Sequence, residues 1–307
     1  MKGVILAAGK GTRLFPVTYH IPKPLLPLAN RLTLEYAFDR LREIEVRDIC
    51  IVVGENEPQL RSALGDGARF GLSLSYVRQT HPQGLAHAVG FAREFVDDEP
   101  FVLYLGDAIY SKGFQDHARR FVESGCANLN LVQWVEDPRR YGVATLDGER
   151  IVKLVEKPKN PESNWAMAGL YFFGPQIWEV LPDLQPSARG EYEITDTIQL
   201  LIDRGHTVLA GIYDGVWYDS GTLDSFLEVS RFLINNGRII DPTARVKAEI
   251  GDAVVIGAGA TVECTRIEDS VILPGARVKI DGEIQHCLLG GTVFSEDPLK
   301  DAILYEG

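Results

Sequence analysis

A six-residue period near the C-terminus constrains the fold more than any other feature of the sequence. Beyond Gly237, aliphatic residues recur at every sixth position, separated by small residues, Gly and Pro. They form three groups: Ile240 and Val246; Ile250, Ile256 and Val262; and Ile272, Val278 and Ile284. In a parallel β-helix each six-residue side of a coil turns one aliphatic side chain inward, so this period predicts a short C-terminal left-handed parallel β-helix. A run of ordinary short strands is the alternative.

The preceding part of the chain alternates apolar runs with segments of helical spacing. Strands are predicted at 3–8, 49–53, 74–77 and 101–105, and helices at 34–44, 58–64 and 85–95. This alternation predicts right-handed βαβ units, and thus an α/β fold with a doubly wound, Rossmann-like mixed sheet. Less regular strands follow at 129–135, 142–146, 151–155 and 170–173, then a helix with Thr195 as its N-cap and a last helix over 223–235. We predict two domains, 1–236 and 237–307.

Charge and cysteine usage exclude several classes of protein. The formal net charge of −12 argues against a nucleic-acid partner, because phosphate backbones are bound by basic faces. Small anionic substrates remain compatible if Lys and Arg are concentrated locally or a cation assists. The four Cys form no C-x-x-C pair, which favours inert thiols in a reducing compartment. Without a signal peptide or an apolar run of membrane-spanning length in this sequence, we expect a cytoplasmic protein with no membrane partner.

The first predicted strand ends in a glycine-rich turn with basic residues, LAAGKGTRL at 6–14. Gly9 and Gly11 let the backbone approach a ligand and point its N–H groups inward, while Lys10 and Arg13 add positive charge. The turn is neither a Walker A loop nor a dinucleotide fingerprint, because the G-K-[ST] ending and the third Gly are missing. Taken alone, such a turn is equally compatible with plain turn chemistry.

The residues that follow resolve this ambiguity. Residues 9–27, GKGTRLFPVTYHIPKPLLP, resemble the long signature G-x-G-T-R-L-x-P-x-T-x-x-x-P-K-x-x-x-P of the sugar nucleotidylyltransferases. Further resemblances to this family follow in order over nearly the whole chain: Gln79 with GLAHA at 84–88, LGD at 105–107, YGV at 141–143, EKP at 156–158, AGLYF at 168–172 and WYDSG at 217–221. The chain is most similar to the long form of the glucose-1-phosphate thymidylyltransferases, including its β-helix tail.

The resemblance implies a role for each matching residue. The expected nucleotide-binding residues are Leu6, Ala7, Ala8, Gly9, Gly11, Thr12, Arg13, Gln79 and Gly84. The expected sugar-phosphate-binding residues are Tyr141, Gly142, Glu156, Lys157 and Gly169, and the expected Mg²⁺ ligands are Asp107 and Asp219. Arg13, Lys23 and Lys157 are the expected catalytic residues. Without the resemblance, Asp107 and Asp219 would be read as turn residues and Gln79 as a solvated strand end.

The implied reaction joins a sugar 1-phosphate, with glucose 1-phosphate expected, to the nucleotidyl group of dTTP or UTP and releases pyrophosphate. Its nucleophile needs no general base, because the second pKa of a phosphate is about 6. The chemistry instead needs two anions held in line and charge neutralised. Ala108 stands where the family commonly has Asn, which removes a donor near the sugar and leaves the preferred sugar open. Thymine and uracil differ by one methyl group, which leaves dTTP against UTP open as well.

Three rival readings remain open at the level of sequence. The chain could be a non-catalytic regulatory paralogue that binds nucleotide sugars, or a UTP-specific uridylyltransferase. The third makes the C-terminal coils an acyltransferase site, but they carry only His286 near their end. We expect the tail to assemble or regulate, and the protein to be a homo-oligomer.

Overall fold

The computed structural model describes residues 1–306, which pack as two compact units. Unit 1 contains residues 1–9 and 37–217, and unit 2 contains residues 10–36 and the chain from 218 on. This division differs from the predicted boundary between 236 and 237. The physical reason is that residues 10–36 and 218–236 pack on the C-terminal coils: for example, Asn30 donates a hydrogen bond from Nδ2 to the carbonyl of Ile256 at 3.1 Å.

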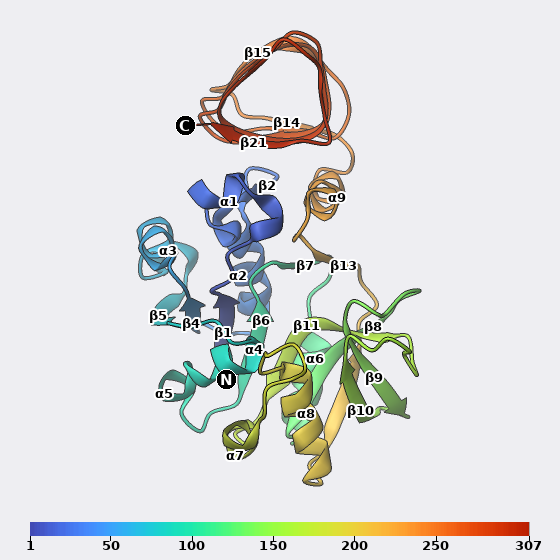
Figure 1. Ribbon diagram of the computed structural model, residues 1–307. Helices are drawn as coiled ribbons and strands as arrows, with labels where there is room; N and C mark the ends of the chain where they lie inside the picture. The colour runs from blue at the N-terminus through green and yellow to red at the C-terminus, as the bar shows by residue number, and fades with distance from the viewer. Residues whose placement is uncertain (307) are drawn as a thin grey trace. The chain divides into compact units, whose positions relative to one another are not determined.

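Unit 1 is an α/β unit built on a nine-stranded sheet (Figure 1). The strands of this sheet are β1 (Lys2–Ala7), β4 (Asp48–Val53), β5 (Ser73–Arg78), β6 (Phe101–Leu105), β8 (Asn128–Trp134), β9 (Gly142–Asp147), β10 (Arg150–Glu156), β11 (Trp165–Phe173) and β12 (Val208–Ile212). Unit 1 also contains β7 (Ala108–Tyr110), which is not part of this sheet. Its helices are the end of α2 (Thr33–Glu43), α3 (Glu57–Leu64), α4 (Leu85–Gly90), α5 (Arg93–Val96), α6 (Gln115–Ser124), α7 (Ile177–Val180) and α8 (Ile194–Asp203).

The sheet is mixed, as predicted, with the order β5-β4-β1-β6-β11-β8-β12-β10-β9. Strands β5, β4, β1 and β6 pair in parallel, whereas β11 pairs antiparallel to both β6 and β8. In β1, Val4 and Leu6 belong to a core that includes side chains of α4, α7 and α8, while Ile5 is fully buried on the opposite face. Burial on both faces explains why this strand is a continuous apolar run.

Two predictions for the helices of unit 1 are wrong in detail. The single helix predicted at 85–95 is two helices, because Phe91 and Ala92 donate to carbonyls three residues earlier and interrupt the α-helical ladder after Gly90. Helix α8 has Glu193 at its N-cap position, so Thr195 lies inside the helix. There Thr195 donates its hydroxyl to Oε2 of Glu156 at 3.2 Å. Strands β7 and β12 and helix α6 had no prediction.

Unit 2 combines short N-terminal segments with a stack of parallel strands. The segments are two 3₁₀ turns (Thr12–Leu14 and Lys23–Leu25), α1 (Val17–His20), β2 (Pro27–Leu28) and β3 (Arg31–Leu32). Helix α9 (Leu223–Leu233) precedes β14 (Arg238–Ile240), β15 (Arg245–Ile250), β16 (Val254–Ile256), β17 (Thr261–Ile272), β18 (Arg277–Ile280), β19 (Glu283–Ser295), β20 (Leu299–Lys300) and β21 (Ile303–Glu306). Strand β13 (Trp217–Asp219) lies at the boundary of the units.

The aliphatic residues of the six-residue period stack in columns along this coiled stack. Register places Val246, Val262, Val278 and Val293 in one column, and Ile250, Ile267 and Ile284 in a second. Ile240, Ile256, Ile272 and Leu289 form a third. Successive coils pair in parallel, and Figure 1 shows them end-on as a triangle. Each predicted group of three therefore contributes one member to each column, and the pair Ile240 and Val246 contributes to two columns. All of these side chains except that of the exposed Ile240 belong to the core of the coils or pack against it.

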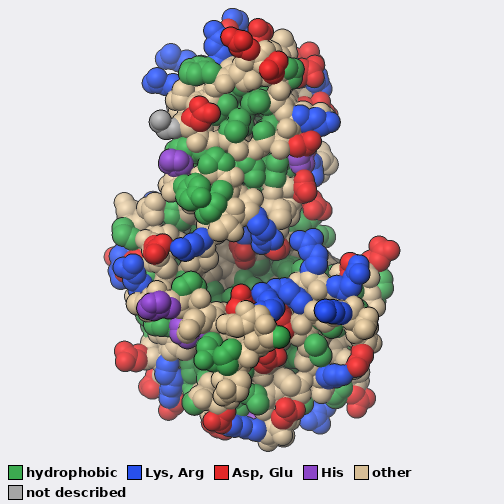
Figure 2. All heavy atoms as spheres, viewed as in Figure 1, with side chains coloured by type: hydrophobic (Ala, Val, Ile, Leu, Met, Phe, Trp, Pro, Cys, Tyr) green, Lys and Arg blue, Asp and Glu red, His purple; other side chains and the backbone are tan. Residues whose placement is uncertain are grey.

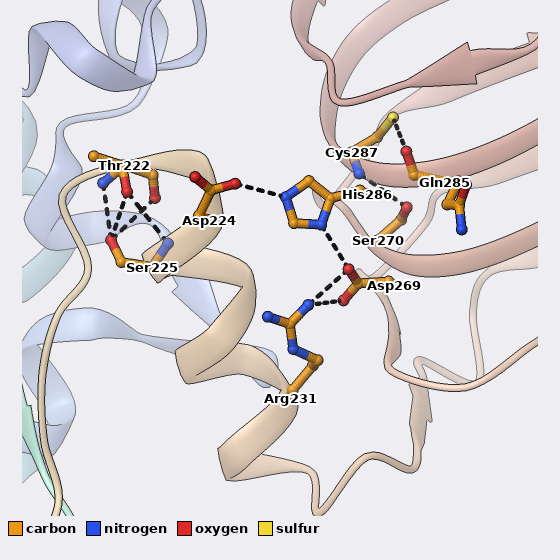
Figure 3. A network of polar contacts seen from close by, with 9 residues as sticks. All are labelled: Thr222, Asp224, Ser225, Arg231, Asp269, Ser270, Gln285, His286 and Cys287. Atoms are coloured by element: carbon orange, nitrogen blue, oxygen red, sulfur yellow. Dashed lines mark hydrogen bonds and ion pairs between the residues drawn. The ribbon is translucent and has the colours of Figure 1, made fainter.

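Helix α9 is attached to the coils by a partly buried ionic network, shown in Figure 3. Nδ1 of His286 lies 2.6 Å from Asp269 Oδ2, and Nε2 lies 2.9 Å from Asp224 Oδ1. Arg231 of α9 donates to both carboxylate oxygens of Asp269, at 2.6 and 2.7 Å. Burial by itself would lower the pKa of His286, but the hydrogen bonds and charges of Asp269 and Asp224 together raise it. The network thus couples α9 to β17 and β19.

The cysteines match the sequence interpretation as inert thiols. All four are free; Cys50, Cys126 and Cys287 are buried and Cys264 is half-buried. Burial raises the pKa of Cys50 to about 12 and that of Cys264 to about 11, so both are thiols near neutral pH. Charged side chains of both signs are interspersed over the visible face in Figure 2.

Candidate active site

In unit 1 the proposed nucleotide loop begins where parallel strands β1 and β6 end side by side. The N–H of Gly106 donates to the carbonyl of Leu6 at 3.0 Å, and Asp107 follows directly. Open α/β sheets bind their ligands at the carboxyl ends of two adjacent strands, at the point where the strand order reverses. Strands β1 and β6 are such a pair, because β4 and β5 lie on the other side of β1. The strand ends therefore bring Leu6 and Ala7 close to the expected metal ligand Asp107.

The loop segment from Ala7 to Gly9 is held from one side by the residues after β4. Asn56 donates from Nδ2 to the carbonyl of Ala7 at 3.0 Å, and a Cβ on Gly54 would lie 2.8 Å from the carbonyl oxygen of Ala8. In contrast, a Cβ on Gly9 would meet nothing within 4 Å. The backbone at Gly9 thus has free space beside it, which a phosphate group could occupy.

The expected base-reading segment brings the end of β5 next to α4. Gln79 is buried, with only 6% exposed, and its Nε2 lies 2.9 Å from Nδ1 of His87. Gly84 has a φ of 109°, and a Cβ there would lie 2.4 Å from the carbonyl oxygen of Tyr192. The close approach of protein backbone is therefore sufficient to require glycine at position 84, and its contact with a base stays a prediction.

The expected sugar-phosphate residues of unit 1 cluster around Glu156. Lys157 has a φ of 42°, and its N–H donates to the carbonyl of Tyr141 at 3.0 Å. Its Nζ lies 3.3 Å from Glu156 Oε1. A Cβ on Gly142 would lie 2.5 Å from Cγ2 of Thr195 and 3.3 Å from Glu156 Oε2. Gly142 thus leaves room mainly for the methyl group of Thr195 beside the Glu156 carboxylate. The structure brings this carboxylate together with Tyr141 and Lys157.

Gly169 lies on the neighbouring strand β11 with a φ of 76°. A Cβ there would lie 3.1 Å from Cδ1 of Leu105, the last residue of β6. The preceding carbonyl, of Ala168, accepts a hydrogen bond from the hydroxyl of Tyr110. Gly169 therefore allows β11 to pass the end of β6 closely.

Arg189 is a cation of this cluster that the sequence interpretation missed. Its Nη1 lies 3.3 Å from Oε1 of Glu156, the same oxygen that Lys157 approaches, and 3.3 Å from Oε1 of Glu193. Glu193 is buried, and burial raises its pKa, with the Glu156 charge adding to that effect. The sequence carries one signal for this residue, the acidic side chains at 191–196 that directly follow a single Arg.

In unit 2 three charged residues far apart in sequence meet. The two 3₁₀ turns carry Arg13 and Lys23, and β13 ends at Asp219. Nζ of Lys23 lies 3.7 Å from Asp219 Oδ1, and Nη2 of Arg13 lies 4.0 Å from Asp219 Oδ2. The side chain of Lys23 is only 9% exposed, so its charge faces Asp219 in a poorly solvated place. The structure thereby joins both expected catalytic cations to one expected metal ligand.

Glycine geometry shapes this cluster at two positions. Gly11 has a φ of 64°, and its carbonyl accepts from the hydroxyl of Thr18 at 2.9 Å, which fixes the turn into Thr12. A Cβ on Gly221 would lie 2.5 Å from Nη2 of Arg13 and 2.8 Å from Asp219 Oδ1. Gly221 is therefore a further site residue. It lies in the quoted WYDSG segment, but a role follows only from its position in space.

The carboxylate of Asp219 is suited to binding a metal cation. Its Oδ1 is buried and accepts no hydrogen bond from the described residues, although Lys23 is near. Carboxylate oxygens are the ligands that Mg²⁺ prefers, and Mg²⁺ typically binds one or two carboxylates together with substrate phosphates. Among residues 1–306 no three His, Cys, Asp or Glu side chains group to hold a metal.

The same residues include no helix long and apolar enough to cross a membrane.

Comparison with known proteins gives consistent results. A family model described as nucleotidyl transferase matches residues 2–236. The chain is 37% identical to the low-salt glycan biosynthesis nucleotidyltransferase Agl11 of Haloferax volcanii, over 94% of this chain and 92% of that protein. It is 38% identical to the glucose-1-phosphate thymidylyltransferase of Streptomyces antibioticus, over 94% of this chain and 81% of that protein. A crystal structure of UDP-glucose pyrophosphorylase complexed with UDP-glucose is similar with a TM-score of 0.69 and 28% identity, covering 76% of this chain and 98% of that one.

Proposed function

Because the chain belongs to the nucleotidyl transferase family and is a sugar nucleotidyltransferase, we propose that it transfers the nucleotidyl group of dTTP to glucose 1-phosphate. Nucleotidyl transfer to a sugar 1-phosphate is the activity that its relatives' names support. The observation that carries the proposal is the convergence of Lys23 and Arg13 on Asp219. UTP is the second candidate donor, supported by the similarity to UDP-glucose pyrophosphorylase.

The proposed reaction forms one P–O bond and breaks another. A phosphate oxygen of the sugar 1-phosphate attacks the α-phosphorus of the triphosphate, and pyrophosphate leaves with the electron pair of the broken bond. No proton has to move, because the attacking phosphate is mostly ionised at neutral pH. The barrier that remains is mutual repulsion of two anions and alignment of the attack, which positioned cations lower.

We assign the cations to the two substrates. Arg13 and the N–H groups of the glycine-rich turn hold the triphosphate, and Lys23 neutralises charge on its α-phosphate. Lys157 and Arg189, which both approach Oε1 of Glu156, would transfer to the incoming sugar phosphate when it binds. Glu156, released from them, accepts hydrogen bonds from sugar hydroxyls.

A divalent metal ion is typical of the family, and Mg²⁺ is the proposed ion here. Asp107 and Asp219 are the proposed ligands, and this assignment is supported by Oδ1 of Asp219, which accepts no hydrogen bond from the described residues. When bound, Mg²⁺ would supply positive charge to the phosphate oxygens. We also propose that the coiled stack is the predicted left-handed β-helix, acting in assembly or regulation.

The test is a coupled pyrophosphate-release assay with Mg²⁺, in which dTTP, UTP, dCTP and ATP are each combined with glucose 1-phosphate and three other sugar 1-phosphates. We expect the highest kcat/KM with dTTP and glucose 1-phosphate. A higher kcat/KM with UTP would shift the assignment to a uridylyltransferase. No release with any pair, from a protein that binds nucleotide sugars by calorimetry, would support the non-catalytic paralogue.

A further inference from the structure

A histidine that the reaction does not use holds the amide of the proposed base-reading residue. His87 lies on α4 with Nδ1 2.9 Å from Nε2 of Gln79, at the end of β5. The imidazole ring packs edge-on against Phe91, with centroids 5.1 Å apart, and stacks with Tyr192 at 6.1 Å. Its position is thus fixed by packing on two sides.

The direction of this hydrogen bond follows from chemistry. An amide nitrogen can only donate, so Nδ1 of His87 must accept, and the neutral imidazole carries its proton on Nε2. Burial lowers the pKa of His87, and the nearby His81 adds to the effect, so the ring is neutral at pH 7. With Gln79 buried, a hydrogen bond at this place restrains its amide more strongly than it would in solvent.

The restraint determines which hydrogen-bonding edge of a base Gln79 can recognise. Once Nε2 is committed to His87, the carbonyl oxygen Oε1 lies on the other arm of the amide and remains the acceptor. Thymine and uracil present a donor, N3–H, between two carbonyl acceptors, whereas cytosine presents an acceptor at N3 beside an amino donor. A flipped amide would pair with cytosine, but it would place Oε1 against Nδ1 of His87, which could donate to it only if the imidazole proton moved from Nε2 to Nδ1.

We propose that His87 is a positioning residue that holds the Gln79 amide in the orientation that accepts thymine or uracil and rejects cytosine. The inference rests on the proposed function, because it takes Gln79 as the residue that reads the base.

The experiment compares wild type with His87→Phe and His87→Asn. Phe keeps the ring packing but removes the acceptor, whereas Asn Oδ1 can accept in the place of Nδ1. For each protein, kcat and KM are measured with dTTP and with dCTP at saturating glucose 1-phosphate. Circular dichroism and melting temperature verify that each variant folds.

We expect His87→Phe to raise KM for dTTP roughly 2- to 10-fold, which is what loss of one neutral hydrogen bond gives. The dTTP-to-dCTP ratio of kcat/KM should fall by a similar factor, with kcat for dTTP within about twofold of wild type. His87→Asn should restore both quantities. A folded His87→Phe protein with wild-type KM and ratio, or a folded His87→Asn protein that behaves like His87→Phe, would overturn the proposal.

A second measurement does not depend on turnover. Nitrogen-15 NMR of the histidine side chains at pH 7.5 reports which ring nitrogen of His87 carries the proton, with His87→Phe identifying the resonance. An unprotonated Nδ1 supports the inference, and a protonated Nδ1 overturns it. If wild type used neither dTTP nor UTP, the proposed function would fail even where the NMR result stood, so the two failures are distinguishable.

Discussion

The ammonium group of Lys23 lies 3.7 Å from Oδ1 of Asp219, in a place where the lysine side chain is only 9% exposed. A poorly solvated cation needs a counter-charge, and here the counter-charge is the carboxylate proposed to bind the metal ion. Substrate and metal binding would therefore exchange this ion pair for contacts of Lys23 with phosphate.

Replacing Lys23 by Met tests the role of that charge. Loss of one preorganised cation at the α-phosphate should lower kcat by roughly 10²–10³. The stem of Met fills most of the same volume, so the melting temperature should change little. Steady-state pyrophosphate release gives kcat, and the exposed Lys247→Met serves as the control. A Lys23→Met enzyme with kcat within tenfold of wild type would remove Lys23 from the catalytic set.

Asp219→Asn tests the proposed metal site. The variant keeps the shape but loses the charge, so the Mg²⁺ concentration for half-maximal activity should rise at least about tenfold. Asp107→Asn should abolish turnover while the fold stays intact. Activity is measured across a Mg²⁺ titration, with Asp214→Asn, an exposed carboxylate paired with Lys112, as the control. An unchanged Mg²⁺ requirement in both site variants would contradict the assignment.

Gly221→Ala should displace the Arg13 guanidinium, because the added Cβ would lie 2.5 Å from Nη2. The clashing atom is the end of a flexible side chain, so we expect a melting temperature within about 2 °C of wild type but a kcat/KM lowered at least about tenfold. Gly90→Ala, whose Cβ would meet nothing within 4 Å, is the matched control. Equal activities of the two variants would show that the Arg13 position is unimportant.

Arg189→Gln tests the second cation at Glu156. Loss of a charge-assisted contact to a partly exposed phosphate should raise KM for glucose 1-phosphate about tenfold and leave KM for dTTP unchanged. Both constants come from initial rates with one substrate varied. Arg119→Gln, which removes an exposed ion pair with Asp116, controls for net charge. A selective rise in KM for dTTP instead would place Arg189 with the nucleotide.

The raised pKa of His286 predicts a pH dependence of stability. A histidine with a higher pKa in the folded than in the unfolded state stabilises fully below the unfolded value of about 6.5, and this contribution is lost as pH rises through the folded pKa. We expect the melting temperature to fall by about 2–4 °C more between pH 6 and pH 9 in wild type than in His286→Asn, which corresponds to about 1 kcal/mol.

Asn is chosen for this test because it tolerates the φ of 55° at position 286. The facing groups are Asp224 and Arg231 of α9 and Asp269 of β17. Identical pH profiles for the two proteins would mean that the His286 charge does not stabilise unit 2. His81→Asn, at an exposed histidine, is the control.

The sequence predicted well those features that depend on local pattern. Strand β6 is a continuous apolar run buried on both faces, and the inward-facing Ile250, Ile256 and Val262 follow the six-residue period. Local pattern was misleading where tertiary contacts compete with it. Thr195 is a good N-cap by type, yet its hydroxyl bonds to Glu156, a residue on a distant strand.

By itself, the sequence determined which residues carry charge and which turn toward a core, because both depend on side-chain chemistry and on the spacing of neighbours along the chain. Only the tertiary structure decided which of them meet. Arg189 joins Lys157 at Glu156, His87 holds Gln79, and Gly221 leaves room for Arg13. These contacts form because the folded backbone brings the segments together, and the distance between two segments in space cannot be calculated from their separation in sequence.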